Sequence, residues 1–451
     1  MKKLFFAMLA LVALASCSKD EVVQLNQDEI KFSVVAENTT KAANVYCQNN
    51  LINSFKVWAE YTEDGSKWSK YFGPETMTKS DAGVWESTAA HYWPDLGTAD
   101  DNKTLRFYAV AGATNVNIVN DADNSAWAGE GKAPIIKDFT PNTNVALQED
   151  LLYAVTNTKV NPTNGTETLN FRHALSQIVF KAKNQNPNIY VEIYGVSVCN
   201  VVGTKTFTFN QAGTESQYID HQQSTNVTIS NQGAWNYTVT NQTTPKDKGT
   251  VSYEVDSETA LAVLDKIDAN DVTRDITAQN NTGKEYCSNA MLLLPQTTDA
   301  WEPSTQWPSP TYEENANDNI VKQPGTYFLL NCKIWNKSGN SVAKDNGGNI
   351  TDVLLWDNQK LKDGSTTEYE DQFIAIPQAA NWEQGKKYTY TFVFTTQGNG
   401  GYDPDPDLPD PDPVLTPIVV NVTVDDFTNG TSTVIDMNAT GTGSSTTSGK
   451  I

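Results

Sequence analysis

The sequence predicts an all-β protein with two β-sandwich-like domains in tandem, preceded by a signal peptide. Short segments that alternate apolar and polar residues recur along the chain, and turn-rich stretches such as 63–66 and 120–124 separate them. With 18 Tyr, 16 Phe and 11 Trp, and with abundant Thr, Asn, Gly and Ser, the composition is typical of strands and turns. The 451 residues are enough for two domains with separate cores.

The first 16 residues have the pattern of a lipoprotein signal peptide. Lys2 and Lys3 precede an apolar run over 4–15, which is too short to span a bilayer but has the length of a signal-peptide core. Ala15 and Ser16 come directly before Cys17, which resembles the lipobox of bacterial lipoproteins. That resemblance implies cleavage between Ser16 and Cys17 and lipidation of the Cys17 thiol, and two or more acyl chains bind a membrane stably. The alternative is an ordinary secretory signal that a cysteine happens to follow.

Residues 17–28 form a polar leader. Its first part, 18–21, resembles the signal that sends lipoproteins of Bacteroidia-type bacteria to the outer face of the outer membrane. We therefore expect a surface-exposed protein of the cell outer membrane.

The N-terminal β domain is expected over 29–183 and the C-terminal β domain over 184–397. The first strand, 29–41, places Ile30, Phe32 and Val34 on one face, which predicts a half-buried strand. A short helical turn is possible over 173–176. Further strands are expected over 54–61, 103–110, 150–156, 167–171, 177–182, 190–201, 204–209, 235–239, 250–255, 290–294, 325–335, 373–376 and 388–395.

The C-terminal part of the chain changes in composition. An Asp/Pro linker covers 398–415, where alternating proline and like charge favour an extended spacer, although the repeated Asp residues could also suggest a cation site. A terminal β-strand follows over 416–427, with Ile418, Val420, Val422 and Val424 on one face. Residues 428–451 are a Ser/Thr/Gly tail in which we expect disorder.

Charge and cysteine content exclude several classes of partner. The formal net charge of −22 cannot neutralise a phosphate backbone, so we expect no nucleic acid partner. Cys47, Cys199, Cys287 and Cys332 include no CxxC pair, which argues against a metal site. Export permits disulfides, but the sequence does not decide between free thiols and bridges.

The sequence contains no recognisable catalytic constellation. There are only three histidines, no HExxH, GxSxG, P-loop or GxGxxG motif stands in a plausible context, and no pair of carboxylates stands out among 54 acidic residues. We expect no enzyme and no cofactor, and His173 is interpreted as structural. Trp301 and Trp307 lie in a Pro-rich loop and are the candidates for exposed, glycan-stacking aromatics.

Several segments together resemble the fimbrillin family, the lipoprotein pilins of Bacteroidia-type bacteria. The matching pieces are IKFSVVAENTTKA (30–42), YWPD and LRFYA within 92–109, DLLYA (150–154), LNFRHALSQIVFKAK (169–183), 191–209, MLLLPQ (291–296) and IPQAANWEQGKKYTYTFVF (376–394). The resemblance covers most of 29–395 and consists of core patterns in a given order.

The family resemblance implies two transthyretin-like β domains and an assembly route. In that route a trypsin-like protease removes the first strand of a surface lipoprotein, and a strand of another subunit fills the groove. An open sheet edge with empty side-chain pockets can accept such a strand.

On this sequence, the resemblance implies that the protease cuts between Lys41 and Ala42. The strand that is removed would then carry Ile30, Phe32 and Val34. Ile418, Val420, Val422 and Val424 are the candidate donor strand, although a late strand can also simply complete the C-terminal domain. The leading hypothesis is a structural subunit of an adhesive fimbria whose partners are other pilin subunits, the maturation protease and an unidentified surface ligand. The long tail leaves room for an accessory or tip subunit, and the alternative is a monomeric glycan-binding surface lipoprotein.

Overall fold

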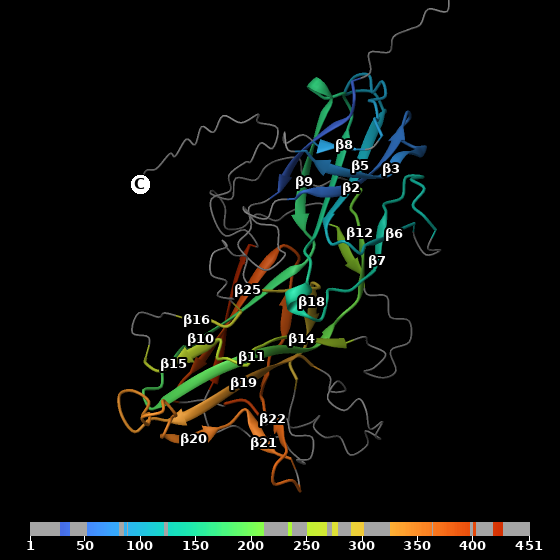
Figure 1. Cartoon of the computed structure of the whole chain (residues 1–451). Coiled ribbons are helices and arrows are strands. Elements are labelled where there is room, and N and C mark those ends of the chain that lie inside the picture. The colour runs from blue at the N-terminus through green and yellow to red at the C-terminus, as the bar shows by residue number, and fades with distance from the viewer. Residues whose placement is uncertain are drawn as a thin grey trace, which may run out of the picture.

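The computed structural model describes residues 28–36, 52–80, 85–87, 89–120, 125–211, 233–236, 250–267, 273–277, 290–301, 325–362, 364–396, 400–402 and 418–426. These residues form an all-β protein with two sandwich-like domains, as expected (Figure 1). Only two short 3-10 turns, Val145–Leu147 and Thr163–Gly165, are helical among them. In this part of the chain no helix has the length and apolar character needed to cross a membrane.

The N-terminal domain is built on a seven-stranded sheet with the order β1-β9-β8-β5-β2-β3-β4. Its strands are β1 (Lys31–Ala36), β2 (Ser54–Thr62), β3 (Trp68–Lys79), β4 (Trp85–Glu86), β5 (Thr104–Gly112), β8 (Leu151–Thr158) and β9 (Thr166–His173). Neighbouring strands run antiparallel except β1 and β9, which are parallel. The first strand of the described residues therefore lies at the end of the sheet, and its only ladder partner among them is β9, which comes much later in the sequence.

The central strands β2, β5 and β8 are buried on both faces of this sheet, because each of them carries apolar side chains on both sides. On β5, Leu105 and Phe107 face one cluster and Tyr108 and Val110 face the other. We call the first cluster the inner core. Its members include Ile30, Phe32, Val34, Phe55, Val57, Phe72, Met77, Trp85, Trp93, Leu105, Phe107, Leu169 and Phe171.

A smaller sheet covers the second face of the N-terminal sheet. Its order is β13-β12-β7-β6. Its strands are β6 (Asn117–Val119), β7 (Ile135–Phe139), β12 (Lys205–Thr208) and β13 (Ala234–Asn236). Ile136 of β7 and Phe207 of β12 are fully buried in the second cluster, which we call the junction core. Because β12 and β13 belong to this sheet, these two strands return to the N-terminal domain.

The C-terminal domain packs two sheets around a third cluster. One sheet has the order β16-β10-β25-β26 with β17 on β10, and the other has the order β14-β11-β19-β20 with β15 on β11 and β23 on β19. The strands of these two sheets are β10 (Ser176–Asn184), β11 (Ile189–Val202), β14 (Thr250–Asp256), β15 (Ala262–Leu264), β16 (Arg274–Asp275), β17 (Met291–Leu293), β19 (Tyr327–Asn336), β20 (Val353–Trp356), β23 (Ile374–Pro377), β25 (Lys386–Phe394) and β26 (Ile418–Asp426). Two further pairs complete the domain: β18 (Gln296–Thr298) with β24 (Ala380–Trp382), and β21 (Gln359–Leu361) with β22 (Tyr369–Asp371).

The division between the domains differs from the expected one after residue 183. Residues 177–184 of β10 pair in parallel with 387–394 of β25, so β10 belongs to the C-terminal domain. The chain passes from one domain to the other at Ala174 and Leu175, between β9 and β10, and residues 173–176 contain no helical turn. Alternation along 177–182 predicts a strand and its faces but says nothing about its partner.

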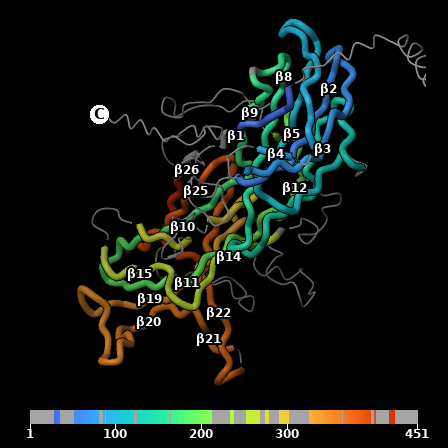
Figure 2. Tube along the Cα trace, turned by 45° about the horizontal axis from the view of Figure 1, so that its top comes forward, coloured from blue at the N-terminus to red at the C-terminus, as the bar shows by residue number. Residues whose placement is uncertain are grey.

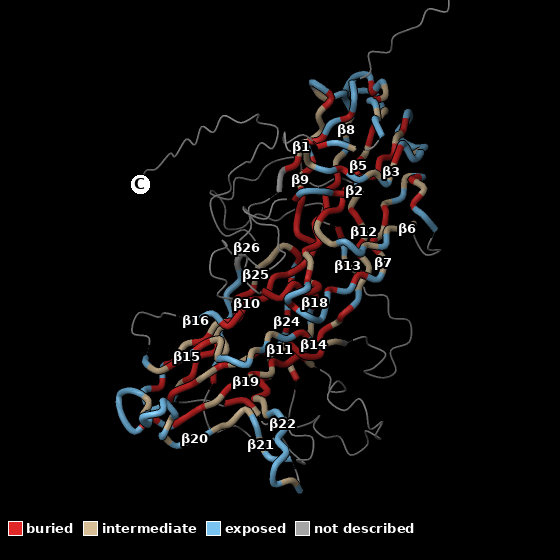
Figure 3. The backbone as a smooth tube through the Cα atoms, in the orientation of Figure 1, coloured by how far each residue is buried: buried red, intermediate tan, exposed pale blue. Residues whose placement is uncertain are grey.

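The two domains share the junction core. Figure 3 shows that the chain is largely buried where they meet. Val179 of β10 and Leu292 of β17 lie in the same cluster as Tyr153 of the N-terminal sheet. Two polar contacts also cross the junction: the Leu292 N–H donates to Gln148 Oε1 at 2.7 Å, and Gln384 Nε2 donates to the Tyr153 hydroxyl at 3.2 Å. The domains are therefore packed against each other by buried side chains as well as joined by the chain.

Candidate functional site

Strand β1 has the exposure pattern that the sequence predicts. Ile30, Phe32 and Val34 are 7%, 3% and 2% exposed, whereas Lys31 is exposed. β1 pairs in parallel with β9 from Lys31 opposite Thr166 to Ala36 opposite Phe171. This pairing joins the first described strand to a strand that lies much further along the sequence (Figure 2).

Phe32 is the centre of the packing between β1 and the inner core. Its ring lies edge-on to Phe107, with centroids 5.3 Å apart, and edge-on to Phe55, with centroids 5.9 Å apart. On the outer side of the strand, the hydroxyls of Ser33 and Thr168 are hydrogen-bonded at 2.8 Å. β1 is thus bound to the domain by apolar packing on one face and by backbone pairing along one edge.

The other edge of β1 forms a seam with the segment that contains β4 and His91. At one end the seam is closed, because Ile30 N–H donates to the His91 carbonyl at 2.8 Å and Trp93 N–H donates to the Asp28 carbonyl at 3.0 Å. The Trp93 ring is fully buried, and its Nε1–H donates to the Gly165 carbonyl at 2.9 Å. The start of β1 is therefore tied to both neighbouring segments.

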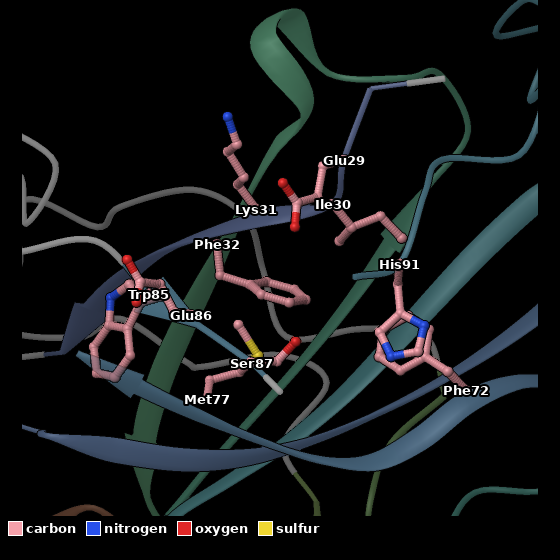
Figure 4. A pocket seen from close by; sticks show the side chains of 10 residues that line it. All are labelled: Glu29, Ile30, Lys31, Phe32, Phe72, Met77, Trp85, Glu86, Ser87 and His91. Atoms are coloured by element: carbon pink, nitrogen blue, oxygen red, sulfur yellow. The ribbon is translucent and has the colours of Figure 1, made fainter. Parts of the chain in front are cut away.

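Beyond Ile30 the seam opens into a cavity of about 280 Å³ (Figure 4). The apolar part of its wall comes from Ile30 and Phe32 of β1, Phe72 and Met77 of β3, and Trp85 of β4. The remaining lining residues are Glu29, Lys31, Glu86, Ser87 and His91. One wall of the cavity is β1 itself, so the cavity exists only while β1 occupies its place.

His91 is fixed at the closed end of the cavity by two neighbours. Its ring stacks on Phe72 with centroids 4.0 Å apart and an angle of 10° between the planes. Its Nε2 lies 3.4 Å from Glu75 Oε1. Glu29, Lys31 and Glu86 are exposed at the rim.

Strand β26 lies at the edge of the C-terminal sheet, antiparallel to β25 from Ile418 opposite Phe394 to Asp426 opposite Lys386 (Figure 2). The expected apolar face is only partly used. Ile418 is 5% exposed and Val420 packs partly against the core, whereas Val422 and Val424 are 47% and 53% exposed. Within this chain, β26 completes its own domain and still presents apolar side chains to solvent.

Trp301 does not have the exposure expected of a glycan contact. It is 2% exposed and packs with Tyr327 and Ala375. A backbone bridge between Ala300 and Thr326 holds the ring there, because it joins Trp301 to the chain that leads into β19. Trp58, Trp93 and Trp335 are buried, as expected. His173 has a structural environment: its Nδ1 lies 2.7 Å from Asp150 Oδ2, and both side chains are buried.

Cys199 and Cys332 are free and buried. Burial raises the pKa of the Cys199 thiol to about 12 and raises the pKa of the Cys332 thiol as well. The other predicted site residues lie outside the described residues: Ser16, Cys17, Lys41, Ala42, Cys47, Cys287 and Trp307.

The cavity could not be predicted from the sequence. Its residues come from four separate segments between Glu29 and His91, and no periodic or motif-like signal connects them. Among the described residues, no group of His, Cys, Asp and Glu is arranged to hold a metal ion.

A family model described as fimbrillin-like matches residues 39–352. Solved structures with similar overall shape include a candidate cell adhesion protein from Bacteroides ovatus, with 10% identity, coverage of 89% of this chain and 98% of that chain, and a TM-score of 0.37. A fimbrial assembly protein from Parabacteroides distasonis has 12% identity, coverage of 88% and 99%, and a TM-score of 0.29. No curated protein matches the chain.

Proposed function

Because the chain belongs to the fimbrillin-like family, we propose that it is a structural subunit of a cell-surface fimbria that serves adhesion. The observation that carries this proposal is the placement of Ile30, Phe32 and Val34. These three side chains are buried in the inner core. They belong to β1, the first strand of the described residues, which lies at the end of its sheet.

We propose that maturation removes β1. The export route begins with a lipid on Cys17 that anchors the precursor to the outer membrane, and a trypsin-like protease then cuts between Lys41 and Ala42, after the strand. Burying an apolar side chain of this size contributes about 1.5–3 kcal/mol. Loss of three such side chains from one groove would therefore leave a surface that binds a replacement strand strongly.

The replacement strand in this proposal is β26 of another subunit. Its alternating residues Ile418, Val420, Val422 and Val424 can present the same spacing as Ile30, Phe32 and Val34. Val422 and Val424 contribute little to their own domain, because about half of each side chain is exposed. Leaving β25 would thus expose mainly Ile418 and part of Val420.

The test compares the full-length precursor with a Lys41→Gln variant, and uses Lys67→Gln as the control at an exposed turn lysine. Limited trypsin treatment should give wild-type and control proteins a new N-terminus at Ala42 and an SDS-resistant ladder of oligomers. Lys41→Gln should stay uncut at that bond and monomeric. A wild-type protein that loses β1 without forming oligomers would contradict the strand exchange, and retention of β1 would contradict the maturation step.

A further inference from the structure

Arg172, the last residue but one of β9, is a buried cation without a counter-charge. It is 8% exposed, and its Nη1 is enclosed and has no hydrogen-bond partner. Among the described residues, no carboxylate forms an ion pair with its guanidinium. Arginine stays protonated in proteins, and buried charges are normally paired because removing an unpaired charge from water is costly. The guanidinium therefore lacks the anion that its burial calls for.

Arg172 lies on the face of the N-terminal sheet that meets the C-terminal domain. It stands opposite Tyr153 in the register of β9 and β8, so the two side chains are on the same face. Tyr153 belongs to the junction core, and its hydroxyl accepts from Gly233 N–H and from Gln384 Nε2, each at 3.2 Å. Burial raises the pKa of this hydroxyl, whereas the Arg172 charge acts to lower it, so the two groups are within electrostatic reach of each other.

The buried carboxylate of Asp150 does not neutralise Arg172. Asp150 Oδ2 lies 2.7 Å from His173 Nδ1, and both side chains are buried. His173 follows Arg172 directly on β9, so its side chain points to the opposite face of the sheet. The Asp150 charge is therefore taken up by a neighbour on the other face.

The accessibility of Arg172 and the charge of the protein limit the kind of anion. The small exposed fraction excludes contact with the surface of a folded partner. Of the three guanidinium nitrogens, Nη1 alone is both enclosed and unpartnered, which leaves the edge formed by Nε and Nη2 for a ligand from solvent. Such an edge matches the two oxygens of a carboxylate. A formal net charge of −22 disfavours anions that carry several charges.

We propose that Arg172 at the domain junction binds a small monocarboxylate anion, with its guanidinium as the main ligand group. The bound anion neutralises a buried charge, so the occupied protein is more stable than the empty one. The site requires neither removal of β1 nor exchange of β26. The inference therefore goes beyond the proposed function.

The binding test uses the uncut full-length protein and saturation-transfer difference NMR with sodium acetate as the probe. Sodium chloride keeps the ionic strength constant, so saturable binding requires a preference for carboxylate over chloride. We expect a dissociation constant of millimolar order, because acetate has few atoms with which to make contacts. Absence of saturable binding to the wild type throughout the millimolar range would overturn the proposal.

Variants of the protein locate the site. Arg172→Met should lose acetate binding, and Arg172→Lys should bind at least about tenfold more weakly, because an ammonium lacks the planar fork. Arg274→Met, at an exposed position of β16, is the control and should bind as the wild type does. Acetate binding at wild-type strength in folded Arg172→Met or Arg172→Lys would place the anion elsewhere and refute the inference.

Urea unfolding provides a second readout at constant ionic strength. The midpoint of the wild type should rise with acetate concentration, whereas that of Arg172→Met should not change. In chloride alone, Arg172→Met should be at least as stable as the wild type, because methionine replaces an uncompensated charge by an apolar side chain of similar length. A variant that is clearly less stable in chloride, or that does not fold, would mean that the protein itself compensates the guanidinium, and would contradict the proposal.

Discussion

Phe32 and Phe107 meet edge to face at the centre of the N-terminal domain, with centroids 5.3 Å apart and planes at 89°. Phe32 belongs to the first strand, and Phe107 belongs to the middle of the sheet that the strand completes. Such pairs contribute about 0.5–1.5 kcal/mol beyond the burial of their area. The contact therefore makes the inner core depend on a strand at the end of its sheet.

Replacing Phe32 by alanine should lower the free energy of unfolding by about 3–5 kcal/mol, since the change removes a buried ring and leaves a cavity. Chemical denaturation of the uncut protein measures the loss. Lys31→Ala on the same strand is the control and should change stability by less than about 0.5 kcal/mol, because Lys31 is exposed. Equal effects of the two substitutions would show that β1 is not packed as described.

The first strand and its buried face could be predicted, because the residues that determine them are neighbours in the sequence. Ile30, Phe32 and Val34 alternate with polar neighbours, and that alternation determines which side chains are buried. The family resemblance was likewise confirmed, because a fimbrillin-like family model matches residues 39–352. The partner of the strand could not be predicted, since parallel pairing with β9 depends on the whole domain.

A buried ion pair in the N-terminal sheet gives a second prediction. Glu60 is fully buried, and its Oε1 accepts from Arg106 Nη1 and from the Tyr108 hydroxyl, each at 2.9 Å. Arg106→Met should destabilise the domain by about 3–5 kcal/mol, because it leaves the Glu60 carboxylate without its counter-charge. The double variant Glu60→Gln with Arg106→Met should recover much of this loss in denaturant unfolding. A double variant as unstable as the single one would show that packing, and not the uncompensated charge, causes the effect.

The buried carboxyl group of Glu167 should make the stability of the protein depend on pH. Desolvation by burial raises its pKa above the ordinary value of 4.5, even though the Thr156 and Thr158 hydroxyls donate to it at 2.8 and 2.7 Å. The folded state therefore binds a proton more readily than the unfolded state, and this contribution to stability is complete below pH 4.5 and is lost as pH rises through the raised pKa.

The melting temperature of Glu167→Gln relative to that of the wild type should accordingly rise between acid and neutral pH. Glu63→Gln, at an exposed turn, serves as the control and should keep the wild-type slope. Identical slopes in all three proteins would contradict the assigned role of Glu167.

The two free thiols should be unreactive in the folded protein. A thiol reacts as its thiolate, and burial raises the pKa of Cys199 to about 12. Peptide mapping after alkylation at mildly alkaline pH should find Cys199 and Cys332 modified only in denaturant. Rapid native labelling of either residue would mean that its strand opens easily.

The outer half of β26 should matter for assembly and not for folding. Val422→Lys and Val424→Lys change side chains that are about half exposed, so the free energy of unfolding should change by less than about 0.5 kcal/mol. If β26 is the donor strand, both variants should lose the oligomer ladder after trypsin treatment, because a lysine would enter an apolar groove. Thr423→Lys changes the exposed residue between them and should retain the ladder. Retention of the ladder in all three proteins would assign the donor role to another strand.

Several features of the candidate site were beyond sequence reasoning for identifiable reasons. Trp301 stands in a Pro-rich stretch that suggests exposure, yet pairing of the chain near it buries the ring beside Tyr327. Val422 and Val424 continue an apolar face that the C-terminal core uses only as far as Val420. Whether such a side chain is buried depends on how far the neighbouring sheet extends. The local sequence pattern carries no information about that extent.

The passage from β9 to β10 through Ala174 and Leu175 has a mechanical consequence. Both residues are fully buried in the junction core, and they are joined there by side chains from both domains. A subunit built in this way has no free hinge between its domains. In a fibre joined by the proposed strand exchange, we expect bending where one subunit meets the next. Tension along such a fibre should reach the contacts between subunits before it separates the two domains of one subunit.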